Sequence, residues 1–547
     1  MGGMTDFFAT HEEVLNRAVQ AIAERGYWSA YPESPSPKVY GETAAADGKA
    51  AFAAYLGGEF PLGQAGVGER VATEVSPFGV PLGIEYPRAE ADALIAAATA
   101  ALPAWRDAGP QVRAGVCLEI LARLHRNVFE LANAVHLTTG QPFVMAFQAG
   151  GPHALDRALE AVAYGYAEQT RQVGEVTWVK KADTLHKTYR IAPRGVALVI
   201  GCNTFPTWNS YPGFFASLVT GNPVIVKPHP RAIAPLAITV KIAREVLAEA
   251  GLDPNLVQLA PEAPGEGLAA VLAIRPEVKI IDYTGSTQFG EWLEASATQA
   301  QVYTEKAGVN TIIIDSTDDF AGMCRNIAFS LTLYSGQMCT TPQNLLIPAV
   351  GITTEAGPKS FDDVVTGIAD AVRGLTADPA KAVEFTGAIV NPDVLTRLTS
   401  VTELGEVVLA AQPLAHPAYP DATCWSPTLI KSTTGYDEEW FGPITFAIPT
   451  DSTQNSLEVF RRTVGDRGAI TAVVYSTDEQ VLDAAELAAL EVGVNISANL
   501  TGGVFVNQSA AFSDFHATGA NRAANSALTD GAYVANRFRV ITARRPA

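Results

Sequence analysis

The stretch Val196-Ala-Leu-Val-Ile-Gly-Cys-Asn-Thr-Phe-Pro206 opens the part of the chain that decides the fold. Its first five residues form an apolar run of strand length, and a turn with glycine, asparagine and proline follows. Further strand patterns cover 223–226, 257–259 and 278–283, and an amphipathic helical pattern covers 233–250. Strands that alternate with helices predict a parallel sheet covered on both faces, in the style of dinucleotide-binding proteins.

A second block of alternating strands and helices follows the first. Its apolar strand patterns cover 311–314, 344–347, 445–448, 472–475 and 503–506. No Gly-x-Gly-x-x-Gly motif stands at the strand-to-helix turns of the first block, so an ordinary phosphate loop is not expected. We predict an α/β protein with two doubly wound domains. In addition, a hairpin over 174–192 and a strand-like tail over 533–543 are expected to form a small β element for oligomerisation.

Composition excludes several classes of protein. Of the 547 residues, 48% are hydrophobic and 17% are charged, so the chain can bury a large core. The formal net charge of −19 repels nucleic-acid backbones. The sequence has no apolar run long enough for a membrane span and no secretory signal pattern, so we expect a cytoplasmic protein without a membrane partner.

The cysteines indicate neither a disulfide framework nor a metal site. There are five, an odd number, and they include no Cys-x-x-Cys pair. No grouping of histidine, cysteine and aspartate has the spacing of metal ligands. We therefore expect a reduced protein without a bound metal ion.

Three features are candidates for chemistry. Cys339 lies in a loop between a helical pattern and a strand, where a thiol can be presented, although most free cysteines are buried packing residues. Glu305 follows a β-rich run, and the alternative interpretation is that it is an ordinary solvated surface residue. The turn from Gly285 to Gly290, with Ser286 after a strand, is typical of phosphate binding at a helix start, or of an ordinary helix cap.

Taken in order, five motifs resemble the aldehyde dehydrogenase superfamily from about residue 75 to 540. The motifs are Pro223-Val-Ile-Val-Lys-Pro228, the turn over 285–290, Glu305, Ser335-Gly-Gln-Met-Cys339 and Glu438-Glu-Trp-Phe-Gly-Pro443. A finer resemblance to the PaaN branch of phenylacetate degradation, without its fused hydratase domain, rests on motifs over 27–33, 138–141, 145–153 and 507–516. The resemblance implies four parts of the chain: a helical N-terminal extension over 1–75, a dinucleotide-binding domain over 76–305, a catalytic domain over 306–515 and an oligomerisation tail over 516–547. It also implies that the protein forms a homodimer or a homotetramer.

The resemblance implies roles for the two candidate side chains. Cys339 would attack a small-molecule aldehyde as a thiolate and form an acyl-enzyme, and Glu305 would activate the water that releases a carboxylic acid. Relatives that transfer the acyl group to coenzyme A usually lack this glutamate, so a CoA-acylating enzyme is the alternative. A non-catalytic binding protein that keeps the fold is a further alternative.

The oxyanion site departs from the family pattern. The family's Pro-Trp-Asn-Phe-Pro motif is replaced here by Cys202-Asn-Thr-Phe-Pro206, which makes Asn203 or Thr204 the expected hydrogen-bond donor, together with the backbone N–H of Cys339. Asn209 is the weaker candidate because it lies toward the next helix. Cys202 could have a role beside the substrate.

The resemblance also implies a nicotinamide cofactor. Lys227 matches the lysine that holds the adenosine ribose, but Pro230 stands where NAD-preferring relatives have an acid, with His229 and Arg231 on either side. A guanidinium without an opposing carboxylate favours a 2′-phosphate, so the expected cofactor is NADP, with NAD as the alternative. The matching motifs assign further cofactor contacts to Gly285, Ser286, Gly290, Glu439 and Phe441.

Overall fold

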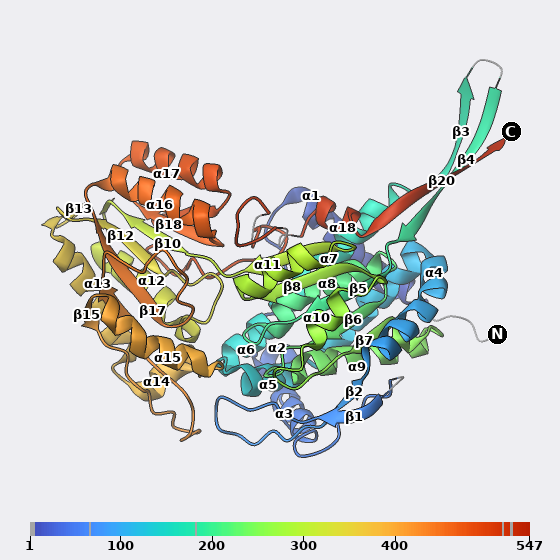
Figure 1. Cartoon of the computed structure of the whole chain (residues 1–547), viewed down its shortest axis with the longest axis horizontal. Helices are drawn as coiled ribbons and strands as arrows, with labels where there is room; N and C mark the ends of the chain where they lie inside the picture. Colours follow the sequence, from blue (N-terminus) through green and yellow to red (C-terminus); the bar gives the residue numbers. More distant parts are fainter. Residues whose placement is uncertain (1–5, 65–66, 181–182, 517–518, 526–528) are drawn as a thin grey trace.

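The computed structural model describes residues 6–64, 67–180, 183–516, 519–525 and 529–547. Two lobes, each built around a parallel sheet, lie side by side, and a three-stranded ribbon projects from one of them (Figure 1). The predicted α/β class is confirmed. Among the described residues, none of the helices combines the length and the apolar composition that a membrane span requires.

The first lobe contains a five-stranded sheet with the order β7-β6-β5-β8-β9, in which every pair is parallel. Its strands are β5 (Val196–Ile200), β6 (Val224–Lys227), β7 (Val257–Leu259), β8 (Val278–Gly285) and β9 (Gln301–Lys306). The helical elements between and after them are α8 (Pro206–Val219), α9 (Ala234–Glu249), η1 (Pro254–Leu256), α10 (Leu268–Ala273) and α11 (Thr287–Ser296).

Helices from the first third of the chain complete this lobe, and among them the long helix α4 contacts strands of the sheet directly. They are α1 (Phe7–Glu24), α2 (Pro37–Tyr40), α3 (Ala44–Ala53), α4 (Ala91–Arg126), α5 (Val128–Thr139), α6 (Phe143–Gly150) and α7 (Pro152–Thr170), with the hairpin of β1 (Val67–Val71) and β2 (Tyr86–Ala89) among them. Asp6 caps α1 by accepting a hydrogen bond from the N–H of Ala9. Helix α4 is kinked at Gly109, whose φ of 84° lies outside the helical region.

The second lobe contains a seven-stranded sheet with the order β15-β16-β17-β12-β10-β18-β19, in which the edge strand β15 alone is antiparallel. Its strands are β10 (Thr311–Ile314), β12 (Asn344–Pro348), β15 (Glu406–Leu409), β16 (Thr428–Lys431), β17 (Ile444–Thr450), β18 (Thr471–Tyr475) and β19 (Asn495–Ala498). The remaining elements are α12 (Phe320–Thr332), η2 (Leu333–Gly336), α13 (Phe361–Thr376), α14 (Pro379–Thr386), α15 (Pro392–Ser400), η3 (Val401–Leu404), α16 (Thr453–Arg467) and α17 (Glu479–Val492), with a small sheet of β11 (Ser316–Thr317), β13 (Ile352–Thr354) and β14 (Gly357–Lys359).

Both faces of the second sheet are buried, which explains its continuous apolar strand patterns. In β10, Ile313 packs in the core on one face, and Ile312 and Ile314 pack in the core on the other. A parallel sheet with helices on both faces needs apolar side chains at successive positions, because successive residues point to opposite faces.

The predicted strand over 503–506 is wrong. This segment is a loop, and the edge strand of the sheet is β19 instead. The side-chain amide of Asn326 donates to the carbonyls of Gly502 and Val504 at 3.0 and 2.8 Å. These carbonyls are therefore engaged by a side chain rather than by a neighbouring strand.

The projecting ribbon joins two segments far apart in the sequence. Strand β4 (Asp183–Pro193) pairs with β3 (Gly174–Lys180) on one side and with β20 (Phe538–Pro546) on the other, and both pairings are antiparallel. The short helix α18 (Gly531–Ala535) leads into β20. Figure 1 shows the three strands extending away from the body of the molecule.

Candidate active site

Cys339 lies in the loop between η2 and β12, and the backbone before it is tightly shaped. Tyr334 and Ser335 have left-handed φ values of 51° and 48°, which non-glycine residues rarely adopt. Gly336 follows with a φ of 64°, and a Cβ atom there would lie 2.3 Å from the carbonyl oxygen of Gly442. The sequence Ser-Gly-Gln-Met-Cys therefore needs its glycine for both conformation and space.

Asn310 holds the loop in place from the second sheet. Its side-chain amide donates to the carbonyls of Cys339 and Thr341 at 2.7 and 2.9 Å, and its side-chain oxygen accepts from the N–H of Ile470 at 2.9 Å. One side chain thus links the cysteine loop to the segment before β18.

The structure brings together Cys339, Glu305 and His516, a residue for which sequence reasoning predicted no role. The Nε2 atom of His516 lies 3.3 Å from Sγ of Cys339 and 3.2 Å from Oε1 of Glu305. Glu305, in β9, and His516 are each only 7% exposed. The ligand atoms of the three side chains all lie within 4.8 Å of one another, so they also form a candidate metal-binding group that sequence spacing did not indicate.

The surroundings shift the pKa values of Glu305 and Cys339 in opposite directions. Burial acts to raise the pKa of Glu305, but the charge and hydrogen bond of His516 outweigh it and leave the pKa below its ordinary value. Burial, with the Glu305 carboxylate, raises the pKa of Cys339 well above its ordinary value. Glu305 is therefore an ionised base at neutral pH, whereas Cys339 needs a positive partner to become a thiolate.

The residues near the predicted oxyanion site are arranged differently from expectation. Asn209 donates from Nδ2 to Oε2 of Glu305 at 3.0 Å, and the thiol of Cys202 lies 3.5 Å from Oδ1 of Asn209. The hydroxyl of Thr204 faces Cys202 at 3.9 Å. Neither Asn203 nor Thr204 is among the described residues that line the cavity beside Cys339, so the assignment of either one as the donor stays a prediction.

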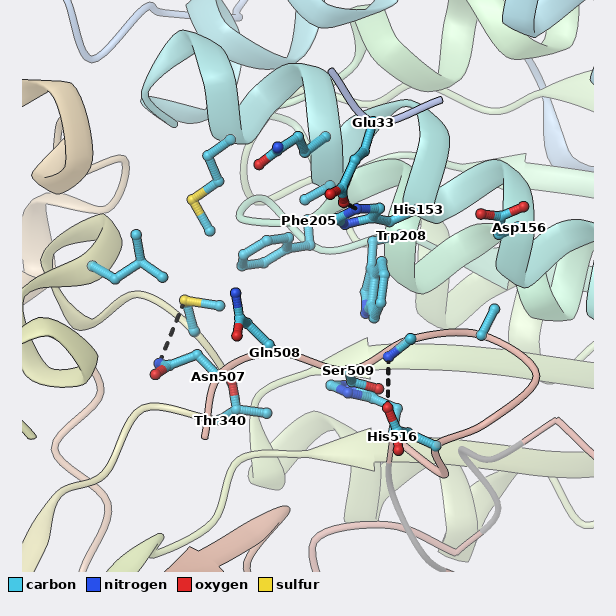
Figure 2. A pocket seen from close by; sticks show the side chains of 18 of the residues that line it. Glu33, His153, Asp156, Phe205, Trp208, Thr340, Asn507, Gln508, Ser509 and His516 are labelled. Carbon is cyan, nitrogen blue, oxygen red and sulfur yellow. Dashed lines mark hydrogen bonds and ion pairs between the residues drawn. The ribbon is translucent and has the colours of Figure 1, made fainter. Parts of the chain in front are cut away.

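A cavity of about 630 Å³ opens onto Cys339 and His516. Figure 2 shows Phe205 and Trp208 on one wall, with Asn507, Gln508 and Ser509 across the space from them. The aromatic residues that line this cavity are Tyr27, Trp28, Phe205, Trp208, Phe329 and Phe385.

The N-terminal extension supplies part of the cavity wall, which sequence reasoning missed. Tyr27, Trp28, Ser29 and Glu33 all line it. Asp156, in α7, fixes this segment by accepting from the Ser29 hydroxyl at 2.5 Å and from the N–H of Ala30 at 2.9 Å. The sequence feature that could have indicated this is Tyr-Trp-Ser-Ala-Tyr over 27–31, because aromatic side chains in an irregular segment are expected to pack against another part of the protein.

The cofactor residues predicted from the first lobe gain a partner that the sequence did not indicate. Lys227, at the end of β6, forms a buried ion pair with Glu262, which follows β7. Glu262 also accepts from the N–H of Leu268 at 2.6 Å. An ammonium and a carboxylate side by side can hold a ribose diol, so this donor set fits the cofactor.

His229 and Arg231 are not placed as free cationic groups. Burial, with the neighbouring charges of Lys227 and Arg231, lowers the pKa of His229 to about 3, so its ring is neutral at pH 7. Arg231 donates from Nη1 to Oδ1 of Asn391 at 2.7 Å, across to α15 of the second lobe.

The other predicted cofactor residues lie at two places. Ser286 caps α11 through a hydrogen bond from the N–H of Phe289 at 3.4 Å, between Gly285 and Gly290. Glu439 and Phe441 line a small cavity of about 20 Å³ with Met338, the neighbour of Cys339. The second group is thus brought next to the cysteine loop.

Comparison with known proteins agrees with this geometry. The model of the Aldehyde dehydrogenase family matches residues 84–530. The chain belongs to the aldehyde dehydrogenase family. It is therefore an oxidoreductase, as the motifs around Cys339 and Glu305 implied.

Three aldehyde dehydrogenases that are similar to this chain differ widely in sequence identity to it. The crystal structure of an NAD-dependent aldehyde dehydrogenase from Burkholderia multivorans is 57% identical, with a TM-score of 0.98, and the match covers 100% of this chain and 99% of that chain. The N-succinylglutamate 5-semialdehyde dehydrogenase of Chromobacterium violaceum is 28% identical over 84% of this chain and 91% of its own length. The 1-pyrroline-5-carboxylate dehydrogenase of Bacillus pumilus is 26% identical over 58% of this chain and 59% of its own length.

Proposed function

We propose that this aldehyde dehydrogenase oxidises a bulky apolar aldehyde, with an aromatic ring as the best fit, to a free carboxylic acid. The observation that carries the reaction is that Sγ of Cys339, which lines the cavity, and a carboxylate oxygen of Glu305 lie within 4.8 Å of each other. Cys339 attacks the aldehyde carbon, and Glu305 later takes a proton from the water that hydrolyses the resulting thioester. A bound nicotinamide cofactor would supply the hydride acceptor for this oxidation, and Lys227 and Glu262 would hold its ribose.

The lining of the cavity supports the apolar substrate. Its aromatic side chains give stacking surfaces with ring edges and faces, which suit another ring. Met145 and Met338 add adaptable apolar contacts. An aldehyde with a ring would thus be desolvated on several sides while its carbonyl reaches Cys339.

Charge at the cavity argues against a carboxylate on the substrate. The described lining residues include the acids Glu33, Asp156, Glu384 and Asp514 but no lysine or arginine. The lining histidine His153 already pairs with Glu33 at 2.8 Å. Relatives named for carboxylate-bearing substrates suggest the rival class, a semialdehyde acid. Such a substrate would lose hydration here without gaining a guanidinium partner.

A role in phenylacetate catabolism stays a prediction from sequence resemblance. The relatives described above carry other names, and the aromatic cavity supports only the broader class of ring-bearing aldehydes.

A panel of aldehydes tests the substrate class. We expect phenylacetaldehyde to be oxidised with a kcat/KM at least tenfold higher than that of succinic semialdehyde, measured by reduced-cofactor absorbance. Cys339→Ala should abolish turnover, and Cys202→Ala should keep most of it. A preference for the semialdehyde acid, or for a cationic aminoaldehyde, would refute the aromatic class.

Release as a free acid is proposed because Glu305 is buried beside Cys339 and ionised. The CoA-acylating alternative would not need this carboxylate. With coenzyme A added to enzyme, aldehyde and cofactor, we expect acid and no thioester by mass spectrometry. Accumulation of the acyl-CoA product would reverse this assignment.

NAD is proposed as the cofactor, in place of the NADP that the sequence favoured. Glu262 supplies, from the loop after β7, the carboxylate that Pro230 lacks, and a carboxylate accepts from ribose hydroxyls but repels a 2′-phosphate. Arg231 is engaged by Asn391. The Burkholderia multivorans relative is described as NAD-dependent.

The two arms of the cofactor test use Glu262→Gln and Arg231→Ala. We expect the first to reduce the ratio of kcat/KM with NAD to that with NADP by about tenfold, corresponding to about 1.4 kcal/mol. The second should leave the ratio nearly unchanged. A wild-type preference for NADP would contradict the proposal.

A second copy of the chain is the proposed partner of the projecting ribbon. Val176, Val179 and Ile541 are 52%, 63% and 53% exposed on it, and the outer edges of β3 and β20 carry backbone groups that a strand of another subunit can pair with. Light scattering should show a dimer or tetramer, and removal of residues 538–547 should shift it toward the monomer. A monomeric full-length protein would contradict this role of the ribbon.

The cytoplasmic location stays a prediction from the sequence.

A further inference from the structure

Three segments far apart in the sequence bring a thiol, an imidazole and a carboxylate to one point. Cys339 comes from the loop after η2, Glu305 from β9 and His516 from a C-terminal loop. The Nε2 atom of His516 lies 3.3 Å from Sγ of Cys339 and 3.2 Å from Oε1 of Glu305, and the three ligand atoms all lie within 4.8 Å of one another. Sulfur, nitrogen and oxygen together are the ligands that Zn²⁺ takes in proteins, whereas Mg²⁺ and Ca²⁺ take oxygen alone.

The separations of the ligand atoms match a tetrahedral zinc site. Zinc bonds of about 2.3 Å to sulfur and about 2.0–2.1 Å to nitrogen and oxygen place neighbouring ligand atoms about 3.3–3.6 Å apart. Both contacts of Nε2 are close to this range, and at most a side-chain rotation brings the sulfur and the carboxylate oxygen into it. Three ligands leave a fourth position for water, on the side of the large cavity that Cys339 and His516 line (Figure 2).

Neighbouring side chains hold two of the three ligands in this arrangement. Asn209 donates from Nδ2 to Oε2 of Glu305 at 3.0 Å, and Oε1 is the oxygen that contacts His516. The ring of His516 packs edge-on against Trp208, with centroids 5.6 Å apart and an interplanar angle of 84°. Groups that orient the ligands in this way strengthen metal binding.

The second nitrogen of the His516 ring is compatible with a metal ion on the first. When Nε2 binds a metal ion, the hydrogen of the neutral ring lies on Nδ1. Nδ1 of His516 is buried and makes no hydrogen bond with the described residues. His516 also lines a second cavity of about 30 Å³, which has room for a water molecule that can accept from Nδ1.

The charge of the large cavity favours the entry of a cation. Its described lining residues include four acids but no lysine or arginine, and Cys339 is partly exposed there. Negative charge along a cleft raises the local concentration of cations. The guanidinium of Arg157 lines the second cavity instead and lies over Trp208, 4.9 Å from the ring centroid.

We propose that Cys339, Glu305 and His516 form a zinc-binding site, and that the bound ion holds the enzyme in a reversibly inactive state. As sulfur bonds to Zn²⁺, the S–H bond of Cys339 breaks and its proton passes to solvent, and no group is oxidised or reduced. One thiolate and one carboxylate balance the charge of the dication. The inactive state rests on the proposed function, because the ion engages both its nucleophile and its base, but the binding of the ion does not.

Cobalt tests the site without aldehyde or nicotinamide cofactor. Co²⁺ occupies zinc sites, and a bond between cobalt and a thiolate gives a charge-transfer band in the near ultraviolet. The full-length protein is stripped of metal with EDTA, dialysed and titrated with Co²⁺ and then with Zn²⁺. We expect one Co²⁺ per chain with the thiolate band, which Zn²⁺ then removes. Cys339→Ser should lack the band, and His516→Gln should bind Co²⁺ about tenfold more weakly or worse.

The matched controls are His153→Gln and Cys202→Ala. The first removes another cavity histidine, whose partner is Glu33, and the second removes the thiol that lies 3.5 Å from Oδ1 of Asn209. Both variants should bind Co²⁺ as the wild type does. A thiolate band that persists in Cys339→Ser, or equal affinities in His516→Gln and the wild type, would overturn the proposal.

A measurement on the wild-type protein covers the case in which the ligand variants fail to fold. Zn²⁺ should protect Cys339 from alkylation by iodoacetamide, as measured by mass spectrometry of its peptide, and EDTA should restore the reaction. Equal alkylation with and without Zn²⁺ would refute the site. A cobalt–thiolate band in a protein that oxidises no aldehyde would refute the proposed function alone, and aldehyde oxidation that Zn²⁺ leaves unchanged would refute the inactive state alone.

Discussion

The amide nitrogen of Asn209 lies 3.0 Å from Oε2 of Glu305, so a residue of α8 orients the carboxylate of β9. The sequence favoured neighbouring Asn203 and Thr204 for chemistry, and it gave Asn209 the weaker claim. In the folded chain, Asn209 holds the side chain proposed to activate water.

Asn209→Ala should slow hydrolysis of the acyl-enzyme, because Glu305 loses one of its two orienting partners. We expect kcat to fall about tenfold with little change in KM. Rapid-mixing kinetics should show a burst of reduced cofactor. Asn127→Ala, which removes an exposed amide that donates to the carbonyl of Arg123, is the control, and an equal loss in that variant would contradict the role of Asn209.

Gly336→Ala should damage both stability and activity. The new Cβ would meet the carbonyl of Gly442 at 2.3 Å, and the residue would have to keep a φ of 64°. A left-handed residue alone costs about 1–3 kcal/mol, and the displaced loop carries Cys339. Gly374→Ala, in helix α13 with open space around it, should instead raise Tm slightly. Comparable Tm values for the two variants would show that the loop can relax.

The stability of the protein should depend on pH through Asp156. Burial raises the pKa of Asp156 to about 7, whereas an unfolded aspartate titrates near about 3.9. Between these values the native state binds more protons than the unfolded state, so this group lowers stability as pH rises from about 4 to 7.

Asp156→Asn removes that titration and keeps an acceptor for Ser29 and Ala30. The difference in Tm between variant and wild type should therefore become more positive from pH 5 to pH 8. Differential scanning fluorimetry measures this difference in Tm. Glu384→Gln, at an exposed position of the same cavity, is the control, and its difference in Tm from the wild type should stay the same across this pH range. A difference that becomes more negative as pH rises would show the opposite linkage.

Asp282→Asn should be strongly destabilising. Asp282, in β8, pairs with fully buried Arg537 at 2.6 and 2.7 Å and accepts from the hydroxyl of Tyr533 at 2.8 Å. Removing the carboxylate charge leaves a buried guanidinium uncompensated, which costs about 3–5 kcal/mol. Denaturant unfolding should show this loss, whereas Glu491→Gln in the exposed pair with Arg461 should change stability by less than about 1 kcal/mol. Similar losses of unfolding free energy in Asp282→Asn and Glu491→Gln would mean that water reaches Arg537.

Local pattern was enough to predict most of the scaffold. The strands that begin at Val196, Val257 and Thr311 were recognisable because a strand buried on both faces must be apolar at successive positions. The strand expected over 503–506 is absent, and the carbonyl of Val504 accepts instead from the side chain of Asn326, far away in sequence. The meeting of Glu305 with Cys339 was expected from the resemblance of their motifs to those of the family.

What only the tertiary structure decided is the set of side chains that complete each site. His516 reaches Cys339 from a C-terminal loop, Glu262 reaches Lys227 from the loop after the neighbouring strand, and Trp28 reaches the cavity from the N-terminal extension. None of these contacts leaves a periodic signal, because the positions are joined by the path of the chain in space rather than by helix or strand geometry. The sequence by itself therefore determined the scaffold and pointed to the proposed nucleophile, and packing between distant segments decided which charged groups surround it.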